Sequence, residues 1–136
     1  MSSFVTPEAQ YTSHLPDSLY AAEQVRELDR VAIKEMGVPG FTLMTRAGEA
    51  AYALLREKWP DYNAIQVFCG VGNNGGDGYI VASLAQRDGL GVQVIQVGDT
   101  AKLKGDARTA YLQAADEQVE MCRVDEFSAY HGSVIV

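Results

Sequence analysis

The residues best suited to chemistry are gathered in the segment Gly70–Gly78, which reads GVGNNGGDG. Five of its nine residues are glycine, and its polar side chains are those of Asn73, Asn74 and Asp77. Glycine lets a ligand approach the backbone closely. The start of a helix presents unpaired N–H groups and a partial positive charge. Because a predicted strand precedes this segment and a predicted helix follows it, the segment is a candidate cradle for a phosphate group.

Three interpretations of this segment stay open on the residues alone. The first is a tight turn without a ligand, since Asn-Gly and Asp-Gly are common turn formers, although five glycines are more than one turn needs. The second is a dinucleotide fingerprint, because Gly70, Gly72 and Gly75 match G-x-G-x-x-G. Asp99 follows the next predicted strand and could hold a ribose. Against this interpretation, Asp77 would stand at the start of the helix and repel a pyrophosphate.

The third interpretation makes Asn73, Asn74 and Asp77 the working groups. Amide and carboxylate oxygens are ligands for hard cations. A loosely held monovalent ion accepts amide and backbone carbonyl oxygens in place of its hydration shell. Such an ion would also offset the repulsion between Asp77 and a phosphate. A Walker loop is excluded, because no Lys-Ser or Lys-Thr pair follows the glycines.

Hydrophobic periodicity and the glycine and proline stops divide the chain into elements that would position this segment. Strands that alternate with helices predict an α/β fold with a mostly parallel sheet and helices on both of its faces. Two helices precede the sheet. Residues 1–17 are expected to form a flexible tail, and 18–136 a single domain. The expected helices cover 22–36, 41–58, 80–87 and 102–117, and the expected strands cover 64–69, 92–97, 119–124 and 133–136.

The sequence ends within the last predicted strand, at the apolar residues Val134–Val136. Open α/β sheets bind ligands outside the carboxyl ends of their strands. The sequence therefore stops where a further contribution to the site would begin, and we expect the domain to be truncated at its C-terminus.

Composition and charge limit the partners of the chain. Its 136 residues are the length of one domain, and a net charge of −7 repels phosphate backbones, so we expect no nucleic-acid partner. There is no apolar run of ~18 residues, and we expect no membrane partner. The two cysteines, Cys69 and Cys122, are typical of buried thiols in a reducing compartment, which predicts a cytoplasmic location.

The glycine-rich segment and its surroundings resemble a known family. The stretch CGVGNNGGDGYIVASLA (69–85) carries the resemblance, and two others support it: LYAAEQVRELDRVAIKEMGVPGFTLMTRAGEAA (19–51) and GVQVIQVG (91–98). They resemble the YjeF N-terminal domain family, the NAD(P)H-hydrate epimerases. The resemblance implies a Rossmann-like three-layer α/β/α fold. It also implies an isomerase that interconverts the R and S epimers of hydrated NADH and NADPH, which are called NADHX and NADPHX.

The resemblance implies site residues as well. Asn73, Asn74, Gly75, Gly76 and Asp77 would contact the hydrated nucleotide, and Asn74 would be a ligand of one potassium ion. The family's other potassium and substrate positions, including an Asp that is the better acid–base candidate, would follow the last residue of this sequence. The chain alone is therefore expected to be a weak catalyst or inactive. A dehydratase domain, often fused C-terminally in bacteria, would restore the S epimer to the working cofactor.

Several assignments around the segment stay open. The catalytic residue is unknown: Asp77 is a candidate acid–base group, and its alternative role is the N-cap of the following helix. Tyr79 is a candidate for stacking on a ligand ring, whereas Cys69 is expected to be a small core residue and not a nucleophile. Val71 stands where the family commonly has proline, which should affect stiffness and not chemistry. The helices near the N-terminus offer a surface for pairing two copies in a homodimer.

Two other function classes are alternatives. One is a non-catalytic binding or scaffold module of the same fold, although relatives that have lost catalysis generally lack the complete NNGGDG motif. The other is an NAD(P)-binding oxidoreductase domain, for which Asp99 should matter and potassium should not.

Overall fold

The computed structural model describes residues 21–130 and 133–136. The chain divides into two units, Met1–Met36 and Gly37–Val136. The predicted tail lies outside the described residues, so its flexibility and the proposed domain boundary stay predictions. No helix in the described ranges is long and apolar enough to cross a membrane.

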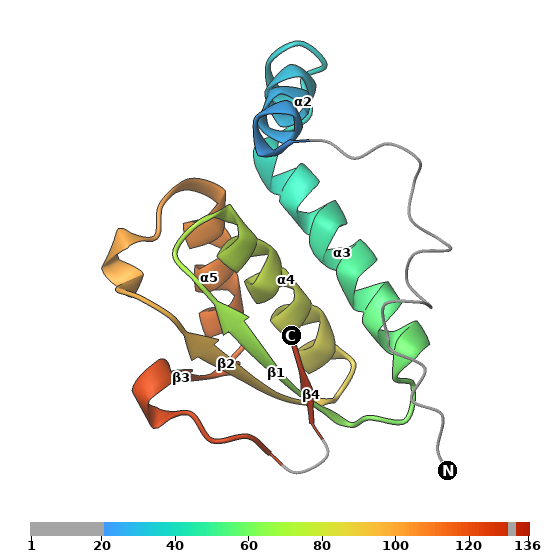
Figure 1. Cartoon of the computed structure of the whole chain (residues 1–136), viewed down its shortest axis with the longest axis vertical. Helices are drawn as coiled ribbons and strands as arrows, with labels where there is room; N and C mark the ends of the chain where they lie inside the picture. Colours follow the sequence, from blue (N-terminus) through green and yellow to red (C-terminus); the bar gives the residue numbers. More distant parts are fainter. Residues whose placement is uncertain (1–20, 131–132) are drawn as a thin grey trace. The chain divides into compact units, whose positions relative to one another are not determined.

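The described part of the first unit is helix α2 (Ala22–Lys34), drawn in blue in Figure 1. The helix predicted from the spacing of apolar residues is confirmed, with an earlier end. Its N-terminus is closed by Gln24, whose side-chain Oε1 accepts a hydrogen bond from the Ala21 N–H at 2.8 Å. No residue of α2 is buried.

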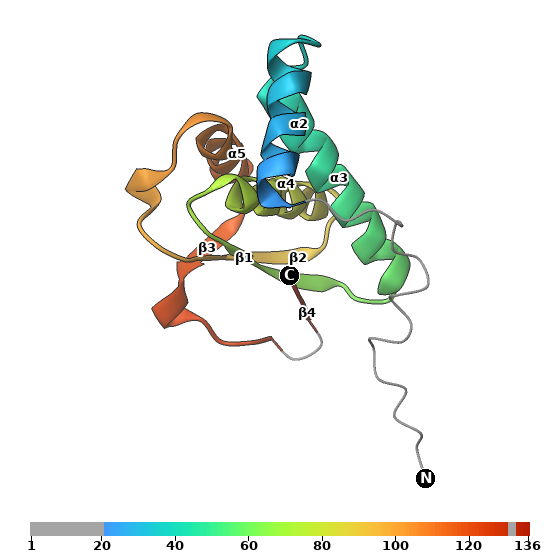
Figure 2. The ribbon, with the colours of Figure 1, turned by 45° about the horizontal axis from the view of Figure 1, so that its top comes forward.

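The second unit is an α/β fold, as predicted. Its four-stranded sheet has the order β3-β2-β1-β4, and every pair of neighbouring strands is parallel. Figures 1 and 2 show the helices arranged beside this sheet. The elements are α3 (Gly40–Lys58), β1 (Ala64–Cys69), α4 (Asn73–Arg87), β2 (Gly91–Gln96), α5 (Gly105–Asp116), β3 (Glu120–Arg123) and β4 (Val134–Ile135), with 3₁₀ turns η2 (Thr100–Lys102) and η3 (Val124–Glu126).

Helix α4 is the central helix of this unit. It packs against β1 and β2 on one side and against α3 and α5 on the others. Its buried residues therefore lie all around the helix rather than along one stripe. They are Gly75, Gly76, Tyr79, Ile80, Val81, Ala82, Ser83 and Ala85. A helix held on so many sides is a rigid support for groups at its N-terminus.

The two faces of the sheet are covered differently. Val67 and Cys69 of β1 point toward α4, where an ideal Cβ on Gly78 would lie 3.3 Å from Val67 Cγ1 and 2.8 Å from Cys69 Sγ. The alternate residue Phe68 points to the opposite face and meets the ring of Phe127, with centroids 4.9 Å apart. Helix α4, which packs against β1 and β2, lies on the face of Val67 and Cys69. The connection from β3 to β4 holds only a 3₁₀ turn, so an irregular segment covers the second face (Figure 2).

A row of polar side chains fixes that segment on the second face. Gln66 Nε2 donates to Gln93 Oε1 at 2.8 Å and to the Ser128 carbonyl oxygen at 2.9 Å. Gln66 Oε1 accepts from the Tyr130 N–H and from Ser133 Oγ, both at 2.9 Å. Gln66 is fully buried, and its amide is satisfied on every side, as a buried polar group requires.

Candidate functional site

The glycine-rich segment lies where the topology of the sheet predicts a ligand. From β1 the chain proceeds through β2 to β3 on one side of the sheet, and it then returns to β4 on the other side of β1. Open α/β sheets bind ligands outside the carboxyl ends of their strands, at the point where the strand order reverses. The segment follows β1 at that end, and it leads directly into α4.

Helix α4 begins within the segment, at Asn73, and the predicted start at Ile80 is wrong. Gly72 is the N-cap, with φ −96° and ψ −170°, and the Gly76 N–H donates to the Gly72 carbonyl oxygen at 3.2 Å. Each glycine inside a helix costs up to ~1 kcal/mol relative to alanine, which explains why the sequence pattern predicted a loop. Close packing of the helix offsets that cost.

The glycines inside α4 serve close packing rather than unusual backbone angles. An ideal Cβ on Gly75 would lie 2.1 Å from the carbonyl oxygen of Gly70, and one on Gly76 would lie 2.5 Å from Met44 Cε of α3. The glycines with positive φ in the described ranges do not include any from Gly70–Gly78. By contrast, a Cβ on Gly72 would meet no atom within 4 Å. The packing glycines hold the helix start in place, and the turn before it faces open space.

The three polar residues of the segment come together at the start of α4. Asn73 and Asn74 are exposed, and Asp77 is half-buried one turn further along. Residues three and four positions apart share a helix face, so Asp77 lies on the side of both asparagines. Asp77 is not the N-cap, because Gly72 holds that position. The expected capping role of Asp77 is therefore wrong, and its carboxylate belongs to the polar group at the helix start.

Two neighbouring residues are withdrawn from the surface. Tyr79 is buried, and its ring meets Tyr111 edge-on with centroids 5.4 Å apart. Its ring is therefore not exposed for the stacking on a ligand that the sequence left open. Cys69 is buried in β1, as predicted for a core residue. Burial raises the pKa of the Cys69 thiol to about 12, which removes the thiolate that nucleophilic chemistry needs.

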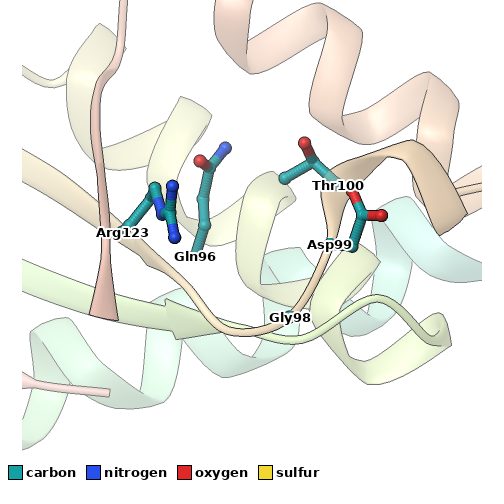
Figure 3. A pocket seen from close by; sticks show the side chains of 5 residues that line it. All are labelled: Gln96, Gly98, Asp99, Thr100 and Arg123. Carbon is teal, nitrogen blue, oxygen red and sulfur yellow. The ribbon is translucent and has the colours of Figure 1, made fainter. Parts of the chain in front are cut away.

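A pocket of about 380 Å³ lies beside this helix start, at the carboxyl ends of β2 and β3. Figure 3 shows its lining residues: Gln96, Gly98, Asp99, Thr100 and Arg123. The sequence singled out Asp99 and missed Gln96 and Arg123. Their sequence signal is weak, because each is only the last residue of a strand. They meet Asp99 because β2 and β3 are parallel neighbours whose ends reach the same edge.

Metal ligands of the usual kinds are not gathered in the described ranges. No group of three or more His, Cys, Asp or Glu residues within 21–130 and 133–136 is arranged to hold a metal ion. A monovalent ion held by amide and backbone oxygens is a different kind of site. Asn74 has the exposed amide that such a site requires.

Comparison with known proteins identifies the family. The model of the family described as YjeF-related protein N-terminus matches residues 40–135, which is more than half of the chain. The chain belongs to the YjeF-related N-terminal family. The match includes the helix start of α4, both asparagines and the adjacent pocket.

Several curated proteins resemble this YjeF-related chain. A bifunctional NAD(P)H-hydrate repair enzyme Nnr from Coxiella burnetii is 42% identical over 118 residues, covering 87% of this chain and 24% of that protein. An NAD(P)H-hydrate epimerase from Rhodopirellula baltica is 39% identical over 85 residues, covering 62% of this chain and 34% of that protein. The chain thus spans between about a quarter and a third of the length of these two relatives.

A solved structure shares the fold of the YjeF-related chain. The crystal structure of yeast ynu0 (YNL200c) aligns with a TM-score of 0.69, covering 80% of this chain and 48% of that one. Sequence identity is 20%, so this likeness supports the fold alone.

Proposed function

We propose that the chain forms part of an NAD(P)H-hydrate epimerase site, which interconverts the R and S epimers of NADHX and NADPHX. One observation carries the proposal: the complete NNGGDG motif forms the first turns of a buried helix at the reversal point of the sheet. The relatives named NAD(P)H-hydrate epimerase support the same activity.

The start of α4 suits the diphosphate of the dinucleotide. The N–H groups of Asn73, Asn74 and Gly75 have no carbonyl four residues earlier within the helix, since helical hydrogen bonding begins at Gly76. These donors and the helix dipole favour an anion. Space for the anion exists beside the turn, because a Cβ on Gly72 would meet no atom within 4 Å.

Asn74 is the proposed potassium ligand. Its amide is exposed, and the Asp77 carboxylate lies on the same helix face. Oxygen donors of these two kinds fit a hard monovalent cation. When bound, the ion would supply positive charge beside the diphosphate and lower the repulsion between that group and Asp77.

Epimerisation requires the bond between the ring carbon and the hydroxyl oxygen to break and to re-form on the opposite ring face. A carboxylic acid near the ring would protonate the departing hydroxyl, which leaves as water. The resulting carboxylate would accept a proton from the water that returns. Such a group contributes ~10²–10⁴-fold when it lies within hydrogen-bond reach. Asp77 is the candidate among the motif residues for this proton transfer.

Replacing Asn74 tests the proposed nucleotide and potassium site. We expect Asn74→Ala to weaken binding of NADPHX and to remove any dependence of that binding on potassium, because the amide oxygen is lost. The measurement is thermal unfolding with NADPHX, with and without potassium. Ligand at ~100 times its dissociation constant stabilises the wild type by roughly 2.7 kcal/mol.

Asn63→Ala is the matched control, because Asn63 is an exposed asparagine before the amino end of β1. It should bind NADPHX as the wild type does. Equal binding by the wild type with and without potassium contradicts the potassium assignment. Failure of the wild type to bind NADPHX under either condition contradicts the proposed function.

Three wider properties belong to the same proposal. Relatives named bifunctional repair enzymes support a dehydratase domain fused to this one. Free Cys69 and Cys122 support a cytoplasmic location, where thiols stay reduced. A homodimer paired through the N-terminal helices stays a prediction, which sedimentation of the purified chain would test.

A further inference from the structure

The pocket beside the helix start has two walls of opposite character. Asp99 and Thr100 form one wall, and Gln96 and Arg123 form the other, with Gly98 between them at the base (Figure 3). One wall therefore offers a carboxylate and a hydroxyl, and the other offers an amide and a guanidinium group. This combination suits a ligand that both donates and accepts hydrogen bonds.

The pocket adjoins the turn that precedes α4. An ideal Cβ on Gly98 would lie 3.4 Å from Val71 Cγ1, and the Val97 N–H donates to the Cys69 carbonyl oxygen at 2.9 Å. Gly98 has φ +94°, a backbone conformation that favours glycine. The chain therefore turns sharply after β2 and brings the pocket against the proposed diphosphate site.

The walls are held by neighbouring groups. Asp99 Oδ1 accepts from the Ala101 N–H at 3.0 Å, which fixes the carboxylate and leaves it further acceptor positions. Gln96 Nε2 donates to Met121 Sδ at 3.3 Å, and Gln96 is also hydrogen-bonded to Tyr79. Arg123 is exposed and its Nε lies 3.5 Å from Asp125 Oδ1, a weak ion pair that an anionic ligand could replace.

We propose that this pocket holds the adenosine ribose of the dinucleotide and that Asp99 and Arg123 together admit it with or without a 2′-phosphate. The inference rests on the proposed function, because the diphosphate must lie at the start of α4. In sheets of this order, an acidic residue after the second strand bonds the ribose hydroxyls, and a nearby arginine accommodates a 2′-phosphate. Here both groups line one pocket, so neither form of the dinucleotide is rejected.

Two substitutions should shift this selectivity in opposite directions. Asp99→Ser removes the carboxylate but keeps an oxygen that caps the 3₁₀ turn, and it should favour 2′-phospho-ADP-ribose over ADP-ribose. Arg123→Gln removes the guanidinium group and should favour ADP-ribose. In each variant, the ratio of the dissociation constants for ADP-ribose and 2′-phospho-ADP-ribose should change by about tenfold. This is the size expected when one charge-assisted hydrogen bond is lost. Arg46→Gln, which removes an exposed positive charge from α3, should leave the ratio unchanged.

Calorimetry gives the dissociation constants, and amide chemical-shift mapping of the chain locates the ligand. Shifts at Gly98 and Thr100 as well as at Asn74, with opposite changes of selectivity, support the inference. Shifts at Asn74 without shifts at Gly98, or no change of selectivity in either variant, overturn the inference and leave the proposed function standing. If neither ligand binds the wild type, the inference and the proposed function both fail.

Discussion

Among the glycines of the GVGNNGGDG segment, Gly75 has the least space for a side chain. Its α-carbon faces the carbonyl group of Gly70, which an ideal Cβ would approach to 2.1 Å. The turn before α4 therefore lies directly against the helix that follows it. This contact fixes the start of the helix against the residue that follows β1, and it gives Gly75 a packing role separate from ligand contact.

Gly75→Ala tests that contact. Because the added methyl group meets backbone and not a flexible side chain, the turn must move, and we expect destabilisation of about 1–3 kcal/mol, as in other overpacked sites. Gly70→Ala is the control, since a Cβ there meets no atom within 4 Å, and its effect should stay within about 0.5 kcal/mol. Urea unfolding measures both free energies. Equal stability of the two variants would contradict the packing role.

At the scale of elements, buried strands were the easiest to predict. Strand β1 has the predicted bounds, Ala64–Cys69, because a short apolar run followed by glycine has few alternatives. The start of α4 was missed, because glycine-rich sequence has low helix propensity and the packing that compensates for it is tertiary. Arg123 was missed for a related reason. Its place in the pocket depends on which strands are neighbours, and no local pattern records that.

On the second face of the sheet, the hydrogen bonds of Gln66 predict that replacing this residue destabilises the protein. Gln66→Leu would leave Gln93 Oε1, the Ser128 carbonyl oxygen and the Tyr130 N–H without their hydrogen-bond partner. Of these groups, that of Gln93 is buried, and an unsatisfied buried group costs ~1–3 kcal/mol, whereas Ser128 and Tyr130 are exposed residues whose backbone groups water can reach. We therefore expect a loss of about 1–3 kcal/mol in the free energy of unfolding. Ser133→Ala, which removes one of the four hydrogen bonds, should cost about 1 kcal/mol.

Urea unfolding followed by tryptophan fluorescence measures these losses. Gln113→Leu, at a half-buried glutamine of α5, serves as the control for the substitution itself. If Gln66→Leu and Gln113→Leu destabilised the protein equally, the hydrogen bonds of the Gln66 amide would not hold the connection between β3 and β4.

At the scale of the whole molecule, local dipoles must act against the net charge. A charge of −7 opposes an anionic dinucleotide, but that field is screened beyond ~8 Å at physiological salt. The helix dipole of α4 and the guanidinium group of Arg123 act at shorter range, at the one edge where the strands end. The topology therefore places the positive end of the α4 dipole and the Arg123 guanidinium group where the ligand would bind, although the net charge of the chain is negative.

The burial of the Cys69 thiol and the Tyr79 hydroxyl predicts how the stability of the whole protein depends on pH. Burial raises the pKa of Cys69 from 9.0, and that of Tyr79 from 10.0, to about 12 in each case. The unfolded chain releases these protons near pH 9 and 10, while the folded protein keeps them until about pH 12. Above pH 9 the unfolded state therefore binds fewer protons than the folded state. The free energy of unfolding has its full value below pH 9 and falls as the pH rises from 9 to about 12.

Cys69→Ala isolates the first step of this alkaline loss. For one buried group the free energy of unfolding falls by about 1.4 kcal/mol per pH unit above the pKa of the unfolded state. The variant should be less stable than the wild type at pH 7, since it loses a packed sulfur. Between pH 9 and 10 its free energy of unfolding should fall less steeply than that of the wild type, because the contribution of Cys69 is gone and that of Cys122, whose pKa is also raised, remains. Urea titrations from pH 7 to about 11 measure both curves. Parallel curves would mean that the Cys69 thiol titrates equally in the folded and unfolded states, and its burial would then have no electrostatic consequence.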